Sequence, residues 1–205
     1  MAKKMDRQLI VGLDIGTSKV VALVGEIAAD NSIEIIGIGS QPSRGLKRGV
    51  IVDMTSTEQA IQRAVEEAEL MADCKINAVT VSMGGNHISS MNSHGIVAIQ
   101  AGEVSELDLE RVIDAARAVA LPSGQKILHI LPQEYVIDGQ EGIQDPLGMA
   151  GVRLEVKVHI VTCALNVSQN IVKCVSRCEL NVDDIVLNAL ASSYAVLTDD
   201  EKELG

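Results

Sequence analysis

Two apolar runs separated by a short polar turn open the chain, in the stretch LIVGLDIGTSKVVALV at 9–24. The two runs predict the strands of a hairpin, because short apolar segments that flank a glycine-centred turn favour paired strands. An alternating segment at 32–40 extends the pair into an antiparallel meander of three strands. The hairpin turn gathers a carboxylate, a glycine, two hydroxyls and an amine: Asp14, Gly16, Thr17, Ser18 and Lys19.

The pattern becomes helical after a glycine-bearing loop at 42–49. Residues 55–72 place apolar side chains on one helical stripe, and Thr55 and Glu58 have the spacing of a capping box. A strand over 76–83 follows this helix. The end of the chain predicts a helix, a strand and a small-residue helix over 166–178, 181–187 and 188–197. Strands interleaved with helices in this order predict an α/β fold.

The segment that begins near Gly85 has strands and a helix of its own. Residues 87–100 predict two short strands that turn near 93–95, and a helix over 106–120 starts at a capping box of Ser105 and Asp108. A strand over 126–138, interrupted by Pro132, and an alternating strand over 153–163 complete the segment. We therefore expect a small α+β subdomain inserted into the first domain.

Composition and charge exclude several classes of function. The formal net charge of −11 argues against a nucleic-acid surface, which needs clustered Lys and Arg. The chain has two Tyr and no Phe or Trp, so bases would find few aromatic rings to stack on. A basic N-terminus precedes the first apolar run, but Asp14 and Lys19 interrupt that run, and we infer neither a secretory signal nor a membrane span. The chain is expected to be cytoplasmic.

Two further sets of residues carry weaker signals. Cys174 and Cys178 could share a helical face, but no second pair with zinc spacing accompanies them, so reduced and buried thiols are the better interpretation. The basic residues of the 42–49 loop could face an acidic partner, although a solvated loop explains them more simply: Arg44, Lys47 and Arg48.

The hairpin turn is a candidate phosphate site. Gly16 can adopt a positive φ and lets a ligand approach the backbone, whose successive N–H groups can bind an anion. Asp14, at the end of a strand, could hold a hydrated Mg²⁺, and the adjacent hydroxyls and Lys19 would add donors. The spacings of the P-loop and of the dinucleotide-binding glycine motif are both absent. An ordinary hairpin remains the alternative interpretation of the turn alone.

The order of elements is similar to the ribonuclease-H-like order of actin-type ATPase lobes, and within that group the chain resembles the FtsA family of bacterial cell-division proteins. The resemblance runs from about Arg7 to the last residue. It rests on five motifs: VGLDIGTSKV at 11–20, PSRG at 42–45, ELMADC at 69–74, LPQEYVID at 131–138 and LASSYAVL at 190–197. It implies subdomain 1A over 1–84 and 163–205, with the subdomain called 1C inserted over 85–162.

The resemblance also implies a function. Asp14, Gly16, Thr17, Ser18 and Lys19 match the first phosphate motif of the superfamily, so ATP and Mg²⁺ are the expected cofactors, with Asp14 acting on the metal through water. FtsA-like proteins link FtsZ filaments to the cytoplasmic face of the inner membrane, associate with themselves and recruit later division proteins through 1C. ATP binding with weak or no hydrolysis is implied, and no metabolic activity.

Two alternatives remain, and one expectation concerns the extent of the chain. Sugar and acetate kinases of the same superfamily open with a similar hairpin, and the 1C-like segment could act alone as a protein-interaction module. FtsA proteins continue into a second lobe with the FtsZ-binding surface and a C-terminal membrane helix. We expect the chain to correspond to the N-terminal half, which holds only one wall of the nucleotide cleft.

Overall fold

The computed structural model describes residues 8–204, and the basic N-terminal segment discussed above lies almost entirely outside them. The chain divides into two compact units. The first unit runs to His87 and resumes at Asn166, and the second unit spans Ile88–Leu165. None of the described helices combines the length and apolar character needed to cross a membrane. Each unit is described by itself.

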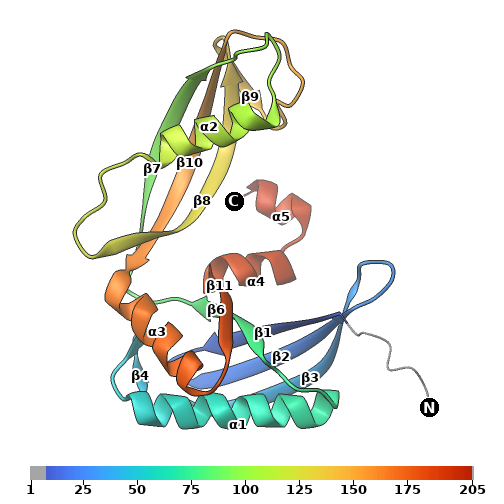
Figure 1. Cartoon of the computed structure of the whole chain (residues 1–205), viewed down its shortest axis with the longest axis vertical. Coiled ribbons are helices and arrows are strands. Elements are labelled where there is room, and N and C mark those ends of the chain that lie inside the picture. The colour runs from blue at the N-terminus through green and yellow to red at the C-terminus, as the bar shows by residue number, and fades with distance from the viewer. Residues whose placement is uncertain (1–7, 205) are drawn as a thin grey trace. The chain divides into compact units, whose positions relative to one another are not determined.

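A five-stranded mixed sheet forms the centre of the first unit, with strand order β11-β6-β1-β2-β3 (Figure 1). The strands β1, β2 and β3 form the predicted antiparallel meander, whereas β6 and β11 run parallel to β1. Two-residue strands β4 and β5 lie in the loop before the first helix. The bounds of these strands are Leu9–Ile15, Lys19–Ile27, Ile33–Pro42, Leu46–Lys47, Val50–Ile51, Ala78–Met83 and Asn181–Leu187 for β1 to β6 and β11.

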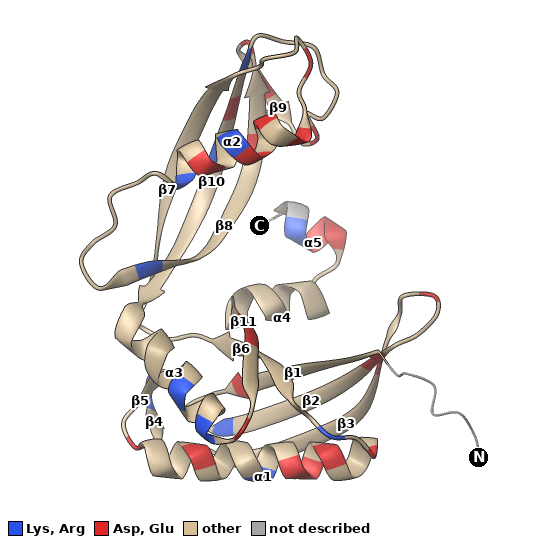
Figure 2. Cartoon of the chain, viewed as in Figure 1, with Lys and Arg blue, Asp and Glu red and all other residues tan. Residues whose placement is uncertain are grey.

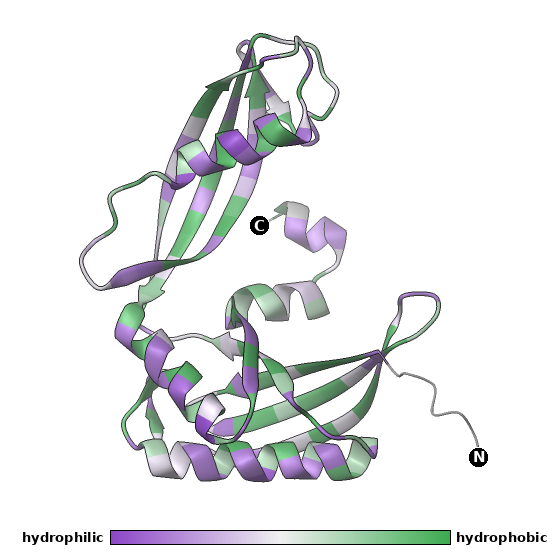
Figure 3. Ribbon diagram, viewed as in Figure 1, coloured by the Kyte–Doolittle hydropathy of each residue, from purple (hydrophilic) through white to green (hydrophobic). Residues whose placement is uncertain are grey.

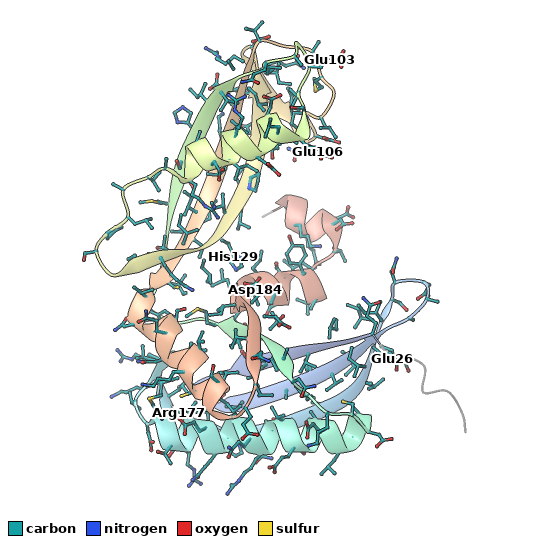
Figure 4. The ribbon with its side chains drawn as sticks, viewed as in Figure 1. Glu26, Glu103, Glu106, His129, Arg177 and Asp184 are labelled. Atoms are coloured by element: carbon teal, nitrogen blue, oxygen red, sulfur yellow. The ribbon has the colours of Figure 1, made fainter. Side chains whose placement is uncertain are left out.

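Helix α1, Met54–Ala72, packs its apolar stripe against β2 and β3. Its outer side carries interspersed acidic and basic residues (Figure 2). The contact with β3 is very close, since a Cβ built on Gly39 would lie 1.8 Å from the Ala64 carbonyl oxygen. The other helices of this part of the chain are α3, Leu165–Arg177, α4, Asn188–Val196, and α5, Asp199–Leu204. Arg177 of α3 reaches toward α1, where its Nη1 lies 2.9 Å from Glu58 Oε1 (Figure 4).

The start of α1 differs from the sequence prediction. The cap is Asp53, whose carboxylate accepts hydrogen bonds from the N–H and the hydroxyl of Ser56. The predicted capping box of Thr55 and Glu58 is therefore wrong: the helix begins at Met54, so Thr55 lies inside its first turn. Glu58 is used elsewhere, in the ion pair with Arg177.

The second unit is a four-stranded antiparallel sheet with one helix on one face. Its strand order is β7-β10-β8-β9, and hydrophobic and hydrophilic residues alternate along its strands (Figure 3). Its own core includes Val112 and Ala116 of the helix and Leu154 and Val156 of β10, all fully buried. The bounds are Ile88–Ala98, Gln125–Ile137, Gln140–Ile143 and Arg153–Ala164 for β7 to β10, and Glu106–Arg117 for α2.

Two features of this unit correct the sequence prediction. The expected turn near 93–95 does not exist, because β7 continues through it in unbroken register with β10. Gly95 has another role there. A Cβ on it would lie 2.1 Å from the Val112 carbonyl oxygen, so α2 can pack this closely on the sheet only because the residue is glycine. Pro132 does not interrupt β8, since a shift of register between Lys157 and Val158 accommodates it.

The capping box of Ser105 and Asp108 at the start of α2 is confirmed. The predicted fold class is confirmed as well, as a mixed sheet with helices that is interrupted in sequence by a smaller α+β unit.

We expect Gly39→Ala to lower the stability of the first unit by about 1–3 kcal/mol, because the added methyl group overpacks the contact with α1. Gly12→Ala is the matched control on β1, since a Cβ there meets nothing within 4 Å. Urea unfolding followed by far-UV circular dichroism measures both variants. Equal effects of the two substitutions would contradict this packing.

The carboxylate of Asp108 should make stability depend on acid pH. Hydrogen bonds from Ser105, together with the charge of Arg111, lower the pKa of Asp108 below its ordinary value of 3.8. The stabilisation is therefore complete above the ordinary pKa and is lost as the pH falls through the lowered value. Thermal unfolding between neutral pH and about pH 3 should show a smaller acid loss for Asp108→Asn than for the unaltered protein.

Glu106→Gln is the control for this experiment, since Glu106 lies in the same helical turn and is exposed (Figure 4). The expected result is an acid dependence close to that of the unaltered protein. Parallel curves for Asp108→Asn and the unaltered protein would refute the assignment.

Candidate functional site

Three parallel strands of the first unit end at the same edge of its sheet. Asp14 of β1 lies opposite Ser82 of β6, and Met83 lies opposite Leu187 of β11. Because the strands run in one direction, the residues that follow them must gather at one edge. Asn188 begins α4 directly after β11. The predicted phosphate turn therefore lies beside two further chain segments.

Asp14 is held by one of its two carboxylate oxygens. The hydroxyl of Ser82 donates to Oδ1, and Asn188 Nδ2 donates to the same oxygen at 2.9 Å. The other oxygen, Oδ2, lies toward the turn, because a Cβ built on Gly16 would come within 3.6 Å of it. A half-buried carboxylate fixed in this way presents one oxygen to the turn. Such an oxygen fits a hydrated Mg²⁺, whose waters need oriented acceptors.

The turn itself is closed by a hydrogen bond from the Gly16 N–H to the Lys19 carbonyl oxygen at 3.0 Å. Gly16 does not adopt a positive φ, contrary to the expectation from sequence. The position needs glycine for another reason, since a Cβ would lie 2.9 Å from that same carbonyl oxygen. The N–H group of Gly16 is thus used within the hairpin, and the donors left for a ligand come from the residues after it.

Thr17 and Ser18 join the turn to the loop that the sequence analysis treated as solvated. The N–H of Gly49 donates to Thr17 Oγ1 at 3.1 Å, and the N–H of Ser43 donates to the Ser18 carbonyl oxygen at 3.0 Å. The loop is therefore part of the site. The basic side chains of this loop, Arg44, Lys47 and Arg48, are exposed, as the interpretation of a solvated loop predicted.

Glycine backbones make up much of the wall beside the turn. Gly49 has a φ of +80°, and a Cβ on it would lie 2.0 Å from the Gly84 carbonyl oxygen. Gly85 has a φ of +138°, and its Cβ would lie 2.6 Å from the Arg48 carbonyl oxygen. The two loops can touch only because neither carries a side chain there. They border an open hollow of about 440 Å³ lined by Ile15, Gly16, Thr17, Arg48, Gly49, Gly84, Gly85, Asn86 and Asn188.

Lys19 lies at a neighbouring hollow of about 480 Å³, which it lines together with Asp14 and Asn188. The structure therefore brings the five predicted residues close together, but they do not all line the same hollow. Gly16 and Thr17 line the glycine-walled hollow, whereas Asp14 and Lys19 line its neighbour. Ser18 is exposed and lines neither hollow.

Sequence reasoning missed the residues that support this turn. Ser82 and Asn188 hold Asp14, and Arg48 lines the hollow, but none of the three was predicted to take part. Two signals could have identified their segments: the Gly84–Gly85 pair directly after a strand, and the predicted start of a helix at Asn188. Both are typical of chain ends that approach a ligand.

The four cysteines are free thiols, and Cys163 and Cys174 are buried. Burial raises the pKa values of Cys174 and Cys178 to about 11, so both thiols stay protonated at neutral pH. Over residues 8–204, no group of His, Cys, Asp and Glu side chains could hold a metal ion. Glu134 lies in the second unit, where Lys157 Nζ lies 2.7 Å from its carboxylate, and the hydrogen bond from Lys157 lowers the pKa of Glu134.

Comparison with known proteins places this geometry in a family. Residues 85–162 match the family described as the SHS2 domain inserted in FTSA. Among solved structures, the PilM-PilN type IV pilus biogenesis complex aligns with a TM-score of 0.62 at 14% identity, over 92% of this chain and 50% of that chain. This likeness supports the actin-like ATPase fold.

Curated relatives extend the match over the whole chain. The cell division protein FtsA of Pseudomonas aeruginosa is 64% identical over 205 residues, which make up 100% of this chain and 49% of that protein. FtsA of Escherichia coli strain K12 is 50% identical over the same share of each chain. The chain thus spans about half the length of the curated relatives it matches. It belongs to the FtsA family of cell division proteins.

Proposed function

We propose that the chain supplies one wall of a Mg·ATP site in an actin-like cell division protein. The observation that carries the proposal is the fixed carboxylate of Asp14, held on Oδ1 by Ser82 and Asn188 while Oδ2 lies toward the Gly16 turn. A carboxylate oriented in this way, beside a turn with two hydroxyl groups and a glycine-walled hollow, suits a hydrated cation with phosphate oxygens.

Each predicted residue has a role in this site. Asp14 would orient a water molecule of the magnesium shell, and the hydroxyls of Thr17 and Ser18 would donate to phosphate oxygens. Lys19 would add a positive charge from the neighbouring hollow. Magnesium itself would neutralise phosphate charge. From the resemblance to actin-type ATPases, we propose that ATP serves assembly and is hydrolysed weakly or not at all.

The role of the whole protein follows from its family. We propose that it links FtsZ filaments to the cytoplasmic face of the inner membrane, associates with itself and recruits later division proteins. Membrane attachment and FtsZ binding would lie in the half of the relatives that this chain does not span. Recruitment would use segment 85–162, whose strands and helix have a core of their own.

Asp14→Asn tests the magnesium site in the full-length gene product. Asn can still accept the two hydrogen bonds at Oδ1 but lacks the charge, so we expect the affinity for Mg·ATP to fall by about 10- to 100-fold, as when an outer-shell partner of a metal is removed. Asp30→Asn, at the exposed turn before β3, is the control. Isothermal titration calorimetry measures both, and an unchanged affinity of Asp14→Asn would move the site elsewhere.

Incubation of the full-length gene product with Mg·ATP and candidate sugars or acetate tests the kinase alternative. We expect no phosphorylated small molecule, because the strand that follows α1 leads through Gly85 directly into segment 85–162. Phosphorus NMR of the reaction mixture detects the product. A phosphorylated sugar or acetate formed at the expense of ATP would overturn the cell-division proposal.

A further inference from the structure

We infer that Arg48 binds the terminal phosphate of the nucleotide and makes the site distinguish a triphosphate from a diphosphate. The inference rests on the proposed ATP site and adds to it a residue that no motif in the sequence indicated. Its basis is the position of Arg48 in the glycine-walled hollow beside Gly16 and Thr17.

The hollow is uncharged except for this side chain. Its other lining residues are Ile15, Thr17, two asparagines and four glycines, so Arg48 is the single charged group among the described residues that line it. The lining also supplies amide, hydroxyl and backbone N–H donors. A guanidinium surrounded by further donors, with no carboxylate lining the same space, favours an anion with several oxygens.

Arg48 is exposed and, like Arg44 of the same loop, forms no ion pair among the described residues, whereas several other basic side chains do. Arg177 pairs with Glu58 at 2.9 Å, and Lys157 pairs with Glu134 at 2.7 Å. In a chain with a net charge of −11, carboxylates are abundant. The guanidinium of Arg48 nevertheless stays available for a ligand, and the hollow in front of it provides the space.

The backbone conformation at residue 48 fixes the position from which the Arg48 side chain extends. Its φ of +53° is left-handed, which is uncommon for a residue with a long side chain. The next residue is tied to the turn by the hydrogen bond from the Gly49 N–H to Thr17 Oγ1 at 3.1 Å. The Arg48 carbonyl oxygen lies against Gly85, where a Cβ would come within 2.6 Å. The side chain therefore starts from an anchored point next to the phosphate turn.

The same contacts form one wall of the hollow beside the turn. The backbones of Gly49 and Gly84 approach so closely that a Cβ would lie 2.0 Å from the facing carbonyl oxygen. In our proposal a chain of phosphates runs along the turn and ends against this wall, since Gly16 and Thr17 of the turn line the same hollow as Arg48. The group that meets Arg48 is therefore the terminal phosphate, which ATP has and ADP lacks.

The test compares Mg·ATP and Mg·ADP binding to the full-length gene product by isothermal titration calorimetry. Arg48→Gln should weaken Mg·ATP by at least about tenfold, the effect of losing a charge-assisted hydrogen bond, and change Mg·ADP by less than about twofold. Arg48→Lys should recover part of the preference for ATP, because a positive charge returns without the planar fork.

Arg44→Gln is the matched control, since Arg44 lies in the same loop, is exposed and lines a different hollow with Arg63. It should leave both affinities unchanged. An equal loss for both nucleotides in Arg48→Gln, or no loss for either, would overturn the role of Arg48.

The outcomes separate this inference from the proposed function. Asp14→Asn should weaken ATP and ADP together, whereas Arg48→Gln should act on ATP alone. If the unaltered protein binds neither nucleotide, both the proposed function and the role of Arg48 are wrong. If Arg48→Gln weakens ATP while Asp14→Asn changes nothing, the magnesium assignment is wrong and the role of Arg48 stands.

Discussion

The parallel pairing of β1, β6 and β11 is the constraint on which the candidate site depends. It brings three chain segments, far apart in sequence, to one edge of the sheet, so that Ser82 and Asn188 can both donate to Asp14. A carboxylate at the end of an isolated hairpin would rotate freely and bind a hydrated cation poorly. Here the sheet orients the carboxylate. The burial and hydrogen bonding of the whole core stabilise the sheet and so hold the site in place.

Glycines determine how closely the surrounding elements approach. Gly39 lets α1 pack closely on the sheet of the first unit, and Gly95 does the same for α2 in the second unit. Gly49 lets its loop contact the backbone that follows β6. In each case a carbonyl oxygen occupies the space that a Cβ would need. These contacts explain why a chain with almost no aromatic side chains still packs tightly: small residues let backbone approach backbone, and Val, Ile and Leu fill the layers between.

Local patterns in the sequence predicted most of the helices and strands and the hairpin turn of the candidate site. The hairpin, the stripe of α1 and the capping box at Ser105 depend on neighbours within a few residues, so their signals are local. The errors arose where distant contacts decide the outcome. Gly95 indicated a turn, but it serves a helix from another part of the chain, and Asp53 rather than Thr55 caps α1. The sequence marked Arg48 only as one of three basic residues in its loop, because its place beside the turn depends on Gly84 and Gly85, which follow a strand predicted separately.

Direct observation of the metal provides the sharpest test of the site. A crystal structure of the full-length gene product grown with ATP and Mn²⁺, which stands in for Mg²⁺ and scatters anomalously, would locate the cation beside its nucleotide. We expect the manganese peak beside Asp14 Oδ2 with one water between them, and the terminal phosphate in the hollow lined by Gly16, Gly49 and Arg48. A manganese peak remote from Asp14, with the turn empty, would contradict the assignment.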